Sequence, residues 1–148
     1  MAFELNYDDA ISLDAEELAE GGIAAAYESL LPALRKFVKN PATIQESLDP
    51  DTPSYTIQCG DLAFEIFGPD LDEEGGGSWG RATVALFAIV NEQLKTSTHR
   101  FYAINAGNDL NGMFLTPADA AKAQKSLTNK EDWPYLPKDE EPWWGMYH

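Results

Sequence analysis

Residues 54–67 have the sequence SYTIQCGDLAFEIF, and this stretch decides the fold. In its first half Tyr55, Ile57 and Cys59 alternate with polar residues, which is the two-residue period of a half-buried strand. A Gly-Asp pair follows and fits a tight two-residue turn, and a second apolar run leads away from it. The stretch predicts a β-hairpin.

The segments after this hairpin predict a loop and then a helix. Residues 68–77, GPDLDEEGGG, combine acidic side chains with three successive glycines and predict an exposed loop. Residues 78–94, SWGRATVALFAIVNEQL, begin with Ser78 as a candidate N-cap and predict a helix whose middle is apolar on nearly all sides. We therefore expect this helix to be the central and most buried one.

A second hairpin and a short helix are predicted further on. Residues 99–104 (HRFYAI) favour a strand, residues 105–112 (NAGNDLNG) tolerate positive φ, and residues 113–115 (MFL) are long enough to pair back. Thr116-Pro117 combines a hydroxyl cap with a proline at the first helical position, which predicts a helix over residues 117–127.

Upstream of residue 54 the sequence predicts a broken helical segment. Asp14 is a candidate N-cap, with Glu17 at the matching position three residues on. Gly21-Gly22 is expected to interrupt the helix, after which an apolar face recurs at three- and four-residue steps up to residue 38. Pro32 falls inside this face and predicts a kink or a new helix start.

The element order indicates an α+β fold. Strands come in hairpins separated by helices and do not alternate as βαβ units, so we expect an antiparallel sheet of about four strands with helices packed on one face. The length of 148 residues fits a single domain over residues 1–148. In the tail, we expect the Trp/Pro-rich residues to be strapped over the body, with Trp133 and Tyr135 buried and at least one of Trp143 and Trp144 partly exposed.

The chain is strongly acidic, with 25 acidic and 10 basic residues and a net charge of -15. Residues 1–80 hold 17 of the acids and only three cations. Such a field repels nucleic acid and anionic membranes and attracts cationic proteins. We therefore expect neither nucleic acid nor a membrane as partner. Because the N-terminus lacks a signal-peptide pattern and Cys59 is the single cysteine, we expect a cytoplasmic protein.

No catalytic or metal-binding motif emerges, so we expect no enzymatic activity and no cofactor. The two histidines are His99 and His148, and no Ser or Cys nucleophile is set beside a base. From Asp70 the acidic loop matches the first positions of a calcium-binding loop, but its twelfth position is Arg81, where a bidentate carboxylate is needed.

The remaining chemistry is recognition of a partner by an acidic surface. If the acidic N-terminal segment and the acidic loop lie on one side, they form an anionic surface, with Trp79 as an aromatic anchor. The predicted partner-binding residues are Asp8, Asp9, Asp14, Glu16, Glu17, Glu20, Asp70, Asp72, Glu73, Glu74 and Trp79.

Four stretches of the chain resemble small bacterial immunity proteins of toxin-immunity systems, including contact-dependent inhibition. They are NYDDA (6–10), SWGRATVALFAIVN (78–91), FYAINAGNDLNGMFLTPADAAKAQ (101–124) and DWPYLPKDEEPWWGMYH (132–148). The resemblance does not reach residues 40–77 and carries no catalytic residues. It implies a cytoplasmic protein that binds and blocks a cognate toxin, often a basic nuclease.

The resulting hypothesis is an immunity protein that occludes a cationic toxin through its acidic surface. Two other classes stay open at this point. A small enzyme or ligand-binding domain requires a pocket in which carboxylates converge. A structural or regulatory adaptor requires an exposed apolar groove and binding that does not depend on charge.

Overall fold

The computed structural model of the chain describes residues 5, 7–69, 71, 77–105 and 107–137. Its helices are α1 (Ala15–Glu17), α2 (Ile23–Leu34), α3 (Gly77–Leu94) and α4 (Pro117–Ser126), with a π-helical turn η2 (Leu18–Gly22) and the 3-10 turns η1 (Tyr7–Asp9), η3 (Gly107–Asp109) and η4 (Lys130–Asp132). Its strands are β1 (Ile11–Ser12), β2 (Gln45–Asp49), β3 (Ser54–Cys59), β4 (Leu62–Phe67), β5 (Arg100–Ile104) and β6 (Asn111–Leu115).

The expected α+β class with antiparallel hairpins is confirmed. The strands form two three-stranded antiparallel sheets, in the orders β1-β6-β5 and β2-β3-β4, where we expected one sheet of about four strands. Strands β1 and β2 are the additional members. The physical reason for two sheets lies in α3, because a helix that is apolar on all sides needs cover on more than one side.

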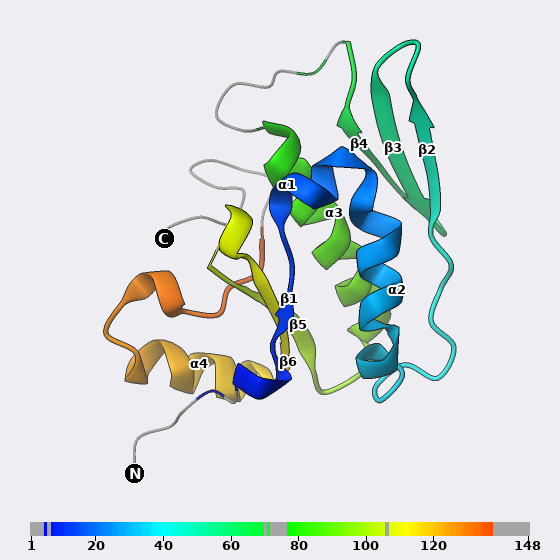
Figure 1. The fold of residues 1–148 in the computed structure, drawn as a ribbon. Coiled ribbons are helices and arrows are strands. Elements are labelled where there is room, and N and C mark those ends of the chain that lie inside the picture. The colour runs from blue at the N-terminus through cyan, green and yellow to red at the C-terminus, as the bar shows by residue number, and fades with distance from the viewer. Residues whose placement is uncertain (1–4, 6, 70, 72–76, 106, 138–148) are drawn as a thin grey trace.

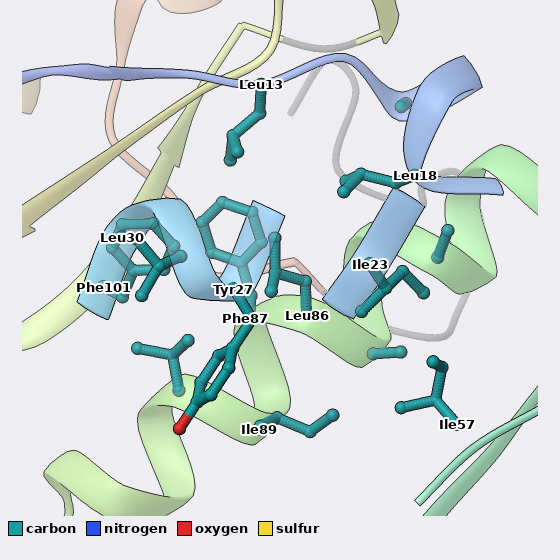
Figure 2. Close-up of a cluster of buried hydrophobic side chains, with 14 of the residues drawn as sticks. Leu13, Leu18, Ile23, Tyr27, Leu30, Ile57, Leu86, Phe87, Ile89 and Phe101 are labelled. Atoms are coloured by element: carbon teal, nitrogen blue, oxygen red, sulfur yellow. The ribbon is translucent and has the colours of Figure 1, made fainter. Parts of the chain in front are cut away.

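Helix α3 contacts both sheets as well as α1, η2 and α2, so it is the central helix, as the sequence predicts (Figure 1). Figure 2 shows how side chains from the surrounding elements point toward one another in this core. Phe87 of α3 stacks on Phe101 of β5 with ring centroids 4.6 Å apart, and Ile57 of β3 is buried in the same cluster. The two sheets are thus joined through one helix.

Helices lie on both faces of the β1-β6-β5 sheet, which corrects the expectation that they pack on one face. A smaller cluster formed by Leu5, Ile104, Met113 and Ala123 lies between this sheet and α4. Strand β5 is therefore buried on both faces, and four of its five residues are buried. Its aromatic composition suits a strand that is covered on both sides.

Local sequence signals account for the ends of several elements. Thr116 caps α4, since its hydroxyl accepts a hydrogen bond from the backbone N–H of Asp119 at 3.1 Å. Gly21 takes a φ of 101°, and the break between α1 and α2 falls at this glycine. Pro32 lies within α2, which continues to Leu34 without the second start that we considered. Helix α3 already includes Gly77, so Ser78 is not its N-cap.

The first part of the tail lies across the β1-β6-β5 sheet. Tyr135 bridges to Ala103 of β5 through two backbone hydrogen bonds of 2.8 and 2.9 Å. The indole N–H of Trp133 donates to the carbonyl of Leu127 at 2.9 Å. Trp133 and Tyr135 are half-buried rather than fully buried. The expectation for Trp143 and Trp144 falls on residues 138–148, which lie outside the described residues.

The helices of the described segments are all too short or too polar to cross a lipid bilayer.

Candidate interaction surface

Asp14 serves as the N-cap that the sequence predicts. Its carboxylate accepts hydrogen bonds from the backbone N–H groups of Glu16 at 2.9 Å and Glu17 at 3.3 Å. It also accepts a hydrogen bond of 3.0 Å from the side-chain amide of Asn108 in η3. Asp14 therefore holds α1 against the loop before β6, and its binding role stays a prediction.

Glu16, Glu17 and Glu20 follow this cap with exposed side chains. No ion pair links any of the three to a lysine or arginine in the described part of the chain. As far as the described residues are concerned, these three charges face solvent, where salt screens them.

Asp8 and Asp9 lie away from these glutamates. They belong to η1, which sits beside α4, whereas α1 follows the far end of β1 (Figure 1). Both side chains are exposed and both take part in interactions within the protein. The predicted N-terminal acids thus occupy two separate places in the fold, because an extended strand separates them.

Trp79 lies near the start of α3 and is half-buried against the main core. A side chain added at Gly107 would meet its ring at 3.9 Å, so Trp79 packs beside η3. Trp79 is therefore a partly buried side chain of the core, and its role as an anchor stays a prediction. The other predicted residues, Asp70, Asp72, Glu73 and Glu74, lie outside the described residues.

Strand β2 brings a second group of acids to the α1–α2 break, which the sequence did not suggest. A Cβ placed on Gly21 would lie 3.6 Å from a methyl group of Leu48, so β2 runs directly beside the η2 turn. Asp49 accepts hydrogen bonds from the backbone N–H groups of Asp51 and Thr52 and so closes the turn after the strand. This group differs from the set predicted from the sequence, and from here on the name acidic surface refers to Glu17, Glu20, Glu46, Leu48, Asp49 and Asp51.

The contact between β2 and α2 is fixed by a buried tyrosine. The Tyr55 hydroxyl accepts a hydrogen bond from the backbone N–H of Ile23 at 3.2 Å and donates to the Glu46 carboxylate at 2.7 Å. Glu46 also accepts from the backbone N–H of Ala24 at 3.4 Å. These bonds satisfy donors of the first turn of α2 and place a negative charge at the positive end of the helix. Burial, followed by the bond to Glu46, raises the pKa of Tyr55.

The cations of the first half of the chain lie at the opposite end of α2. Arg35, Lys36 and Lys39 follow its last residue, about 18 Å from its first at the usual helical rise. Stacking of Phe37 on His99, with centroids 4.3 Å apart, joins this end to the segment after α3. This separation exceeds the Debye length of about 8–10 Å in physiological salt, so these cations do little to neutralise the acidic surface.

Two hollows lie near this surface. The larger has Glu46 and Glu65 among its lining residues, but their carboxylates lie on opposite faces of the sheet. One of about 540 Å³ covers the polar outer face of the β2-β3-β4 sheet, and one of about 220 Å³ lies between α2 and residues 41–44. Glu65 shares the outer face with Thr56, while the Glu46 carboxylate is bound to Tyr55 on the inner face. The smaller hollow has Glu28 as its one carboxylate.

No group of three or more His, Cys, Asp or Glu side chains within the described segments is placed to hold a metal ion. The chemistry that the described arrangement offers is charge, an apolar contact at Leu48 and backbone hydrogen bonding along β2.

Sequence reasoning missed β2 for an identifiable reason. Its sequence QESLD is polar and all five residues are exposed, so the apolar alternation that marks a strand is nearly absent. The available signal was the spacing of Ile44, Glu46 and Leu48 before Pro50, in which a glutamate occupies the middle inward position.

The fold and this surface define a small α+β protein that presents an acidic, partly apolar surface beside an edge strand. The chain matches no family model, no curated protein and no solved structure.

Proposed function

We propose that this protein is an immunity protein that binds a cognate toxin domain and neutralises it by occlusion. The partner is a cationic, nuclease-like domain, and the acidic surface covers it. The resemblance of residues 6–10, 78–91, 101–124 and 132–148 to immunity proteins supports the class, and the charge supports the partner.

The observation that carries the proposal is the setting of Leu48. Its side chain is 54% exposed, and with Leu136 it is one of two large apolar residues that are exposed in the described part of the chain. It lies between the η2 turn and the acids of β2, away from the cations beyond α2. Leu48 thus offers a cationic partner an apolar contact beside carboxylates, which combines desolvation with attraction between charges.

The two parts of this surface have different roles in binding. Exposed carboxylates raise the rate of encounter with a cationic partner and make that rate fall with salt. Leu48 and the backbone beside it are desolvated only in the complex and slow dissociation. A toxin made in the same cell demands tight binding, so we expect a dissociation constant below about 1 μM, or more than about 8 kcal/mol.

The proposal is tested by mixing the purified protein with the toxin domain encoded beside it. Isothermal titration at low and at physiological salt is expected to give a sub-micromolar complex that weakens as salt rises, together with loss of toxin activity. Absence of a complex at micromolar concentration and low salt would remove the proposal.

Charge reversal then locates the interface. Glu20→Lys is expected to weaken the complex about tenfold and to lower the association rate. The matched control is Glu92→Lys, which makes the same charge change at the far end of α3, where Glu92 pairs with Lys95. Equal weakening by both variants would mean that net charge alone drives association and that the acidic surface is not the interface.

A further inference from the structure

The edges of the two sheets differ in how they are closed. In the β1-β6-β5 sheet, β1 is only two residues long, which leaves little free backbone. The free edge of β5 is occupied by Tyr135, whose N–H and carbonyl both bond to Ala103. Proteins commonly shorten or cover sheet edges because unpaired edges recruit other chains.

The β4 edge of the second sheet is closed in another way. Helix α3 packs against β4, and the guanidinium of Arg81 donates from Nε to the carbonyl of Ile66 at 2.7 Å. Ile66 sits at the register shift between the pairs Tyr55–Phe67 and Thr56–Glu65, so no residue of β3 lies directly opposite it. A side chain thus takes the hydrogen bond that an added strand would seek.

The β2 edge is open within the described part of the chain. All five residues of β2 are exposed, and none of them makes a backbone hydrogen bond to a described residue outside its own sheet. In Figure 1, β2 is the outermost strand of its sheet. It also contains no proline.

The register identifies which backbone groups face this edge. Cys59 and Leu62 flank a two-residue turn and therefore bond to each other. Because bonded and non-bonded pairs alternate along an antiparallel ladder, Gln58 and Thr56 direct their backbone groups toward β2. Their partners Gln45 and Ser47 point back toward β3. The N–H and C=O groups of Glu46 and Leu48 consequently point outward.

Charge distinguishes between a second copy of this chain and a cationic segment as the occupant of the β2 edge. Pairing of two copies through β2 would bring together Glu46, Asp49 and Asp51 from each chain, on molecules that each carry a net charge of -15. Like charges across such an interface oppose association. A segment carrying Lys or Arg gains attraction from the same carboxylates.

We propose that the β2 edge is a docking site that receives an extended, positively charged segment of the partner protein as a fourth strand of the sheet. The outward groups of Glu46 and Leu48 bond to the backbone of that segment, and its side chains alternate between the two faces. Because Glu46 and Leu48 share one face of β2, the apolar residues of the segment fit on that face beside Leu48, and its cations fit on the other face beside Asp49. This inference deepens the proposed function and rests on it for the identity of the partner.

The test uses a peptide of about ten residues in which lysine alternates with threonine or valine, a length that exceeds a typical strand. Nuclear magnetic resonance of the full chain at low salt follows the amide signals and the hydrogen exchange of Glu46 and Leu48. We expect submillimolar binding with slowed exchange at these two amides. A control peptide of the same sequence carries two consecutive central N-methyl groups, which remove a backbone donor from each edge, and it is expected to bind about tenfold more weakly.

Two variants of the protein distinguish the contribution of the Leu48 backbone N–H to peptide binding from that of the Leu48 side chain. Leu48→Ala removes the apolar contact and retains the outward N–H, whereas Leu48→Pro removes both. Because this N–H points away from β3, a proline is tolerated at an edge position of this kind. We expect Leu48→Pro to bind the unmodified peptide more weakly than Leu48→Ala does and to discriminate less between the two peptides.

Two results would overturn the inference. One is equal binding of the two peptides by the wild-type protein. The other is unchanged exchange at Glu46 and Leu48 with ~1 mM peptide, a concentration that detects a binding free energy of about 4 kcal/mol. These outcomes do not depend on the toxin. If the peptide pairs with β2 and the neighbouring toxin does not bind, the docking site stands and the proposed function fails. If the toxin binds and the peptide fails, the proposed function stands and the docking site is rejected.

Discussion

In the β1-β6-β5 sheet the described edges are a two-residue strand and a strand closed by Tyr135, whereas the β2-β3-β4 sheet ends in a five-residue strand that no described residue covers. The first sheet is packed on both faces and the second on one. The two sheets thus differ in whether their edges are protected from pairing with another chain. The closed sheet serves stability, and the open sheet keeps backbone donors and acceptors available for binding.

The largest expected effect lies in the closed sheet, at Gly112 of β6. A Cβ at this position would lie 2.2 Å from the ring of Phe101, which is fully buried between Phe87 and Phe114. We expect Gly112→Ala to lower the free energy of unfolding by about 3 kcal/mol, measured by urea denaturation. In the open sheet, Gly60→Ala meets no atom within 4 Å and carries only the strain of a φ of 59°, worth about 1–2 kcal/mol. Equal losses would contradict the difference in packing.

Removing the side chain of Tyr135, the residue that covers the free edge of β5, is expected to have the next largest effect. Tyr135→Ala loses a half-buried ring and the hydrogen bond from its hydroxyl to the carbonyl of Asn105. We expect a loss of about 2–3 kcal/mol in the free energy of unfolding. The neighbouring Leu136 is 42% exposed, so Leu136→Ala is the matched control and is expected to cost less than about 0.5 kcal/mol. An unchanged free energy of unfolding in Tyr135→Ala would show that this side chain does not stabilise the sheet.

Alkaline pH tests the tyrosine that joins β2 to α2. Burial first, and the hydrogen bond to Glu46 second, raise the pKa of Tyr55 in the folded protein. The unfolded chain therefore releases this proton at about pH 10 while the folded chain keeps it, so stability is full below pH 10 and falls as pH rises further. Between pH 10 and 11, the release of this one proton lowers the free energy of unfolding by about 1 kcal/mol.

Tyr55→Phe is therefore expected to flatten this decline by up to that amount, measured by denaturation at a series of pH values. Tyr27 and Tyr135, whose pKa values burial also raises, preserve a residual decline in the variant. An unchanged pH dependence would mean that the Tyr55 phenol does not titrate differently in the two states.

The smallest effect on stability is expected in the open strand. Leu48 is more than half exposed, so Leu48→Ala is expected to change the free energy of unfolding by less than about 0.5 kcal/mol. The same variant is expected to weaken the complex with the toxin domain about tenfold, as for a residue at the centre of an interface. Thermal melting and isothermal titration of the same preparation measure the two effects. A variant that loses stability and keeps its affinity would place Leu48 in the fold and outside the interface.

The features that could be predicted from the sequence are those that depend only on residues close together in the chain. The Asp14 and Thr116 caps, the break at Gly21 and the turn at Gly60-Asp61 each depend on residues within a few positions, and all four are confirmed. The central place of α3 followed from apolar residues on all its sides.

The arrangement of strands and of charge could not be predicted in the same way. The division into two sheets depends on β1 and β2, which are two residues long and fully exposed respectively, so neither has a hydrophobic period. The separation of Asp8 and Asp9 from α1 depends on the path of β1 in space. Glu46 is placed by a hydrogen bond from Tyr55, which lies nine residues further along the chain. This contact could be predicted only if the β2–β3 pairing were already known.

Amide hydrogen exchange of the protein, free and bound to its proposed toxin partner, shows directly where that partner docks. We expect slowed exchange at Glu46, Leu48 and the η2 turn, with little change at β5 and α4 on the closed sheet. Protection confined to β5 and α4, with β2 exchanging as in the free protein, would contradict it.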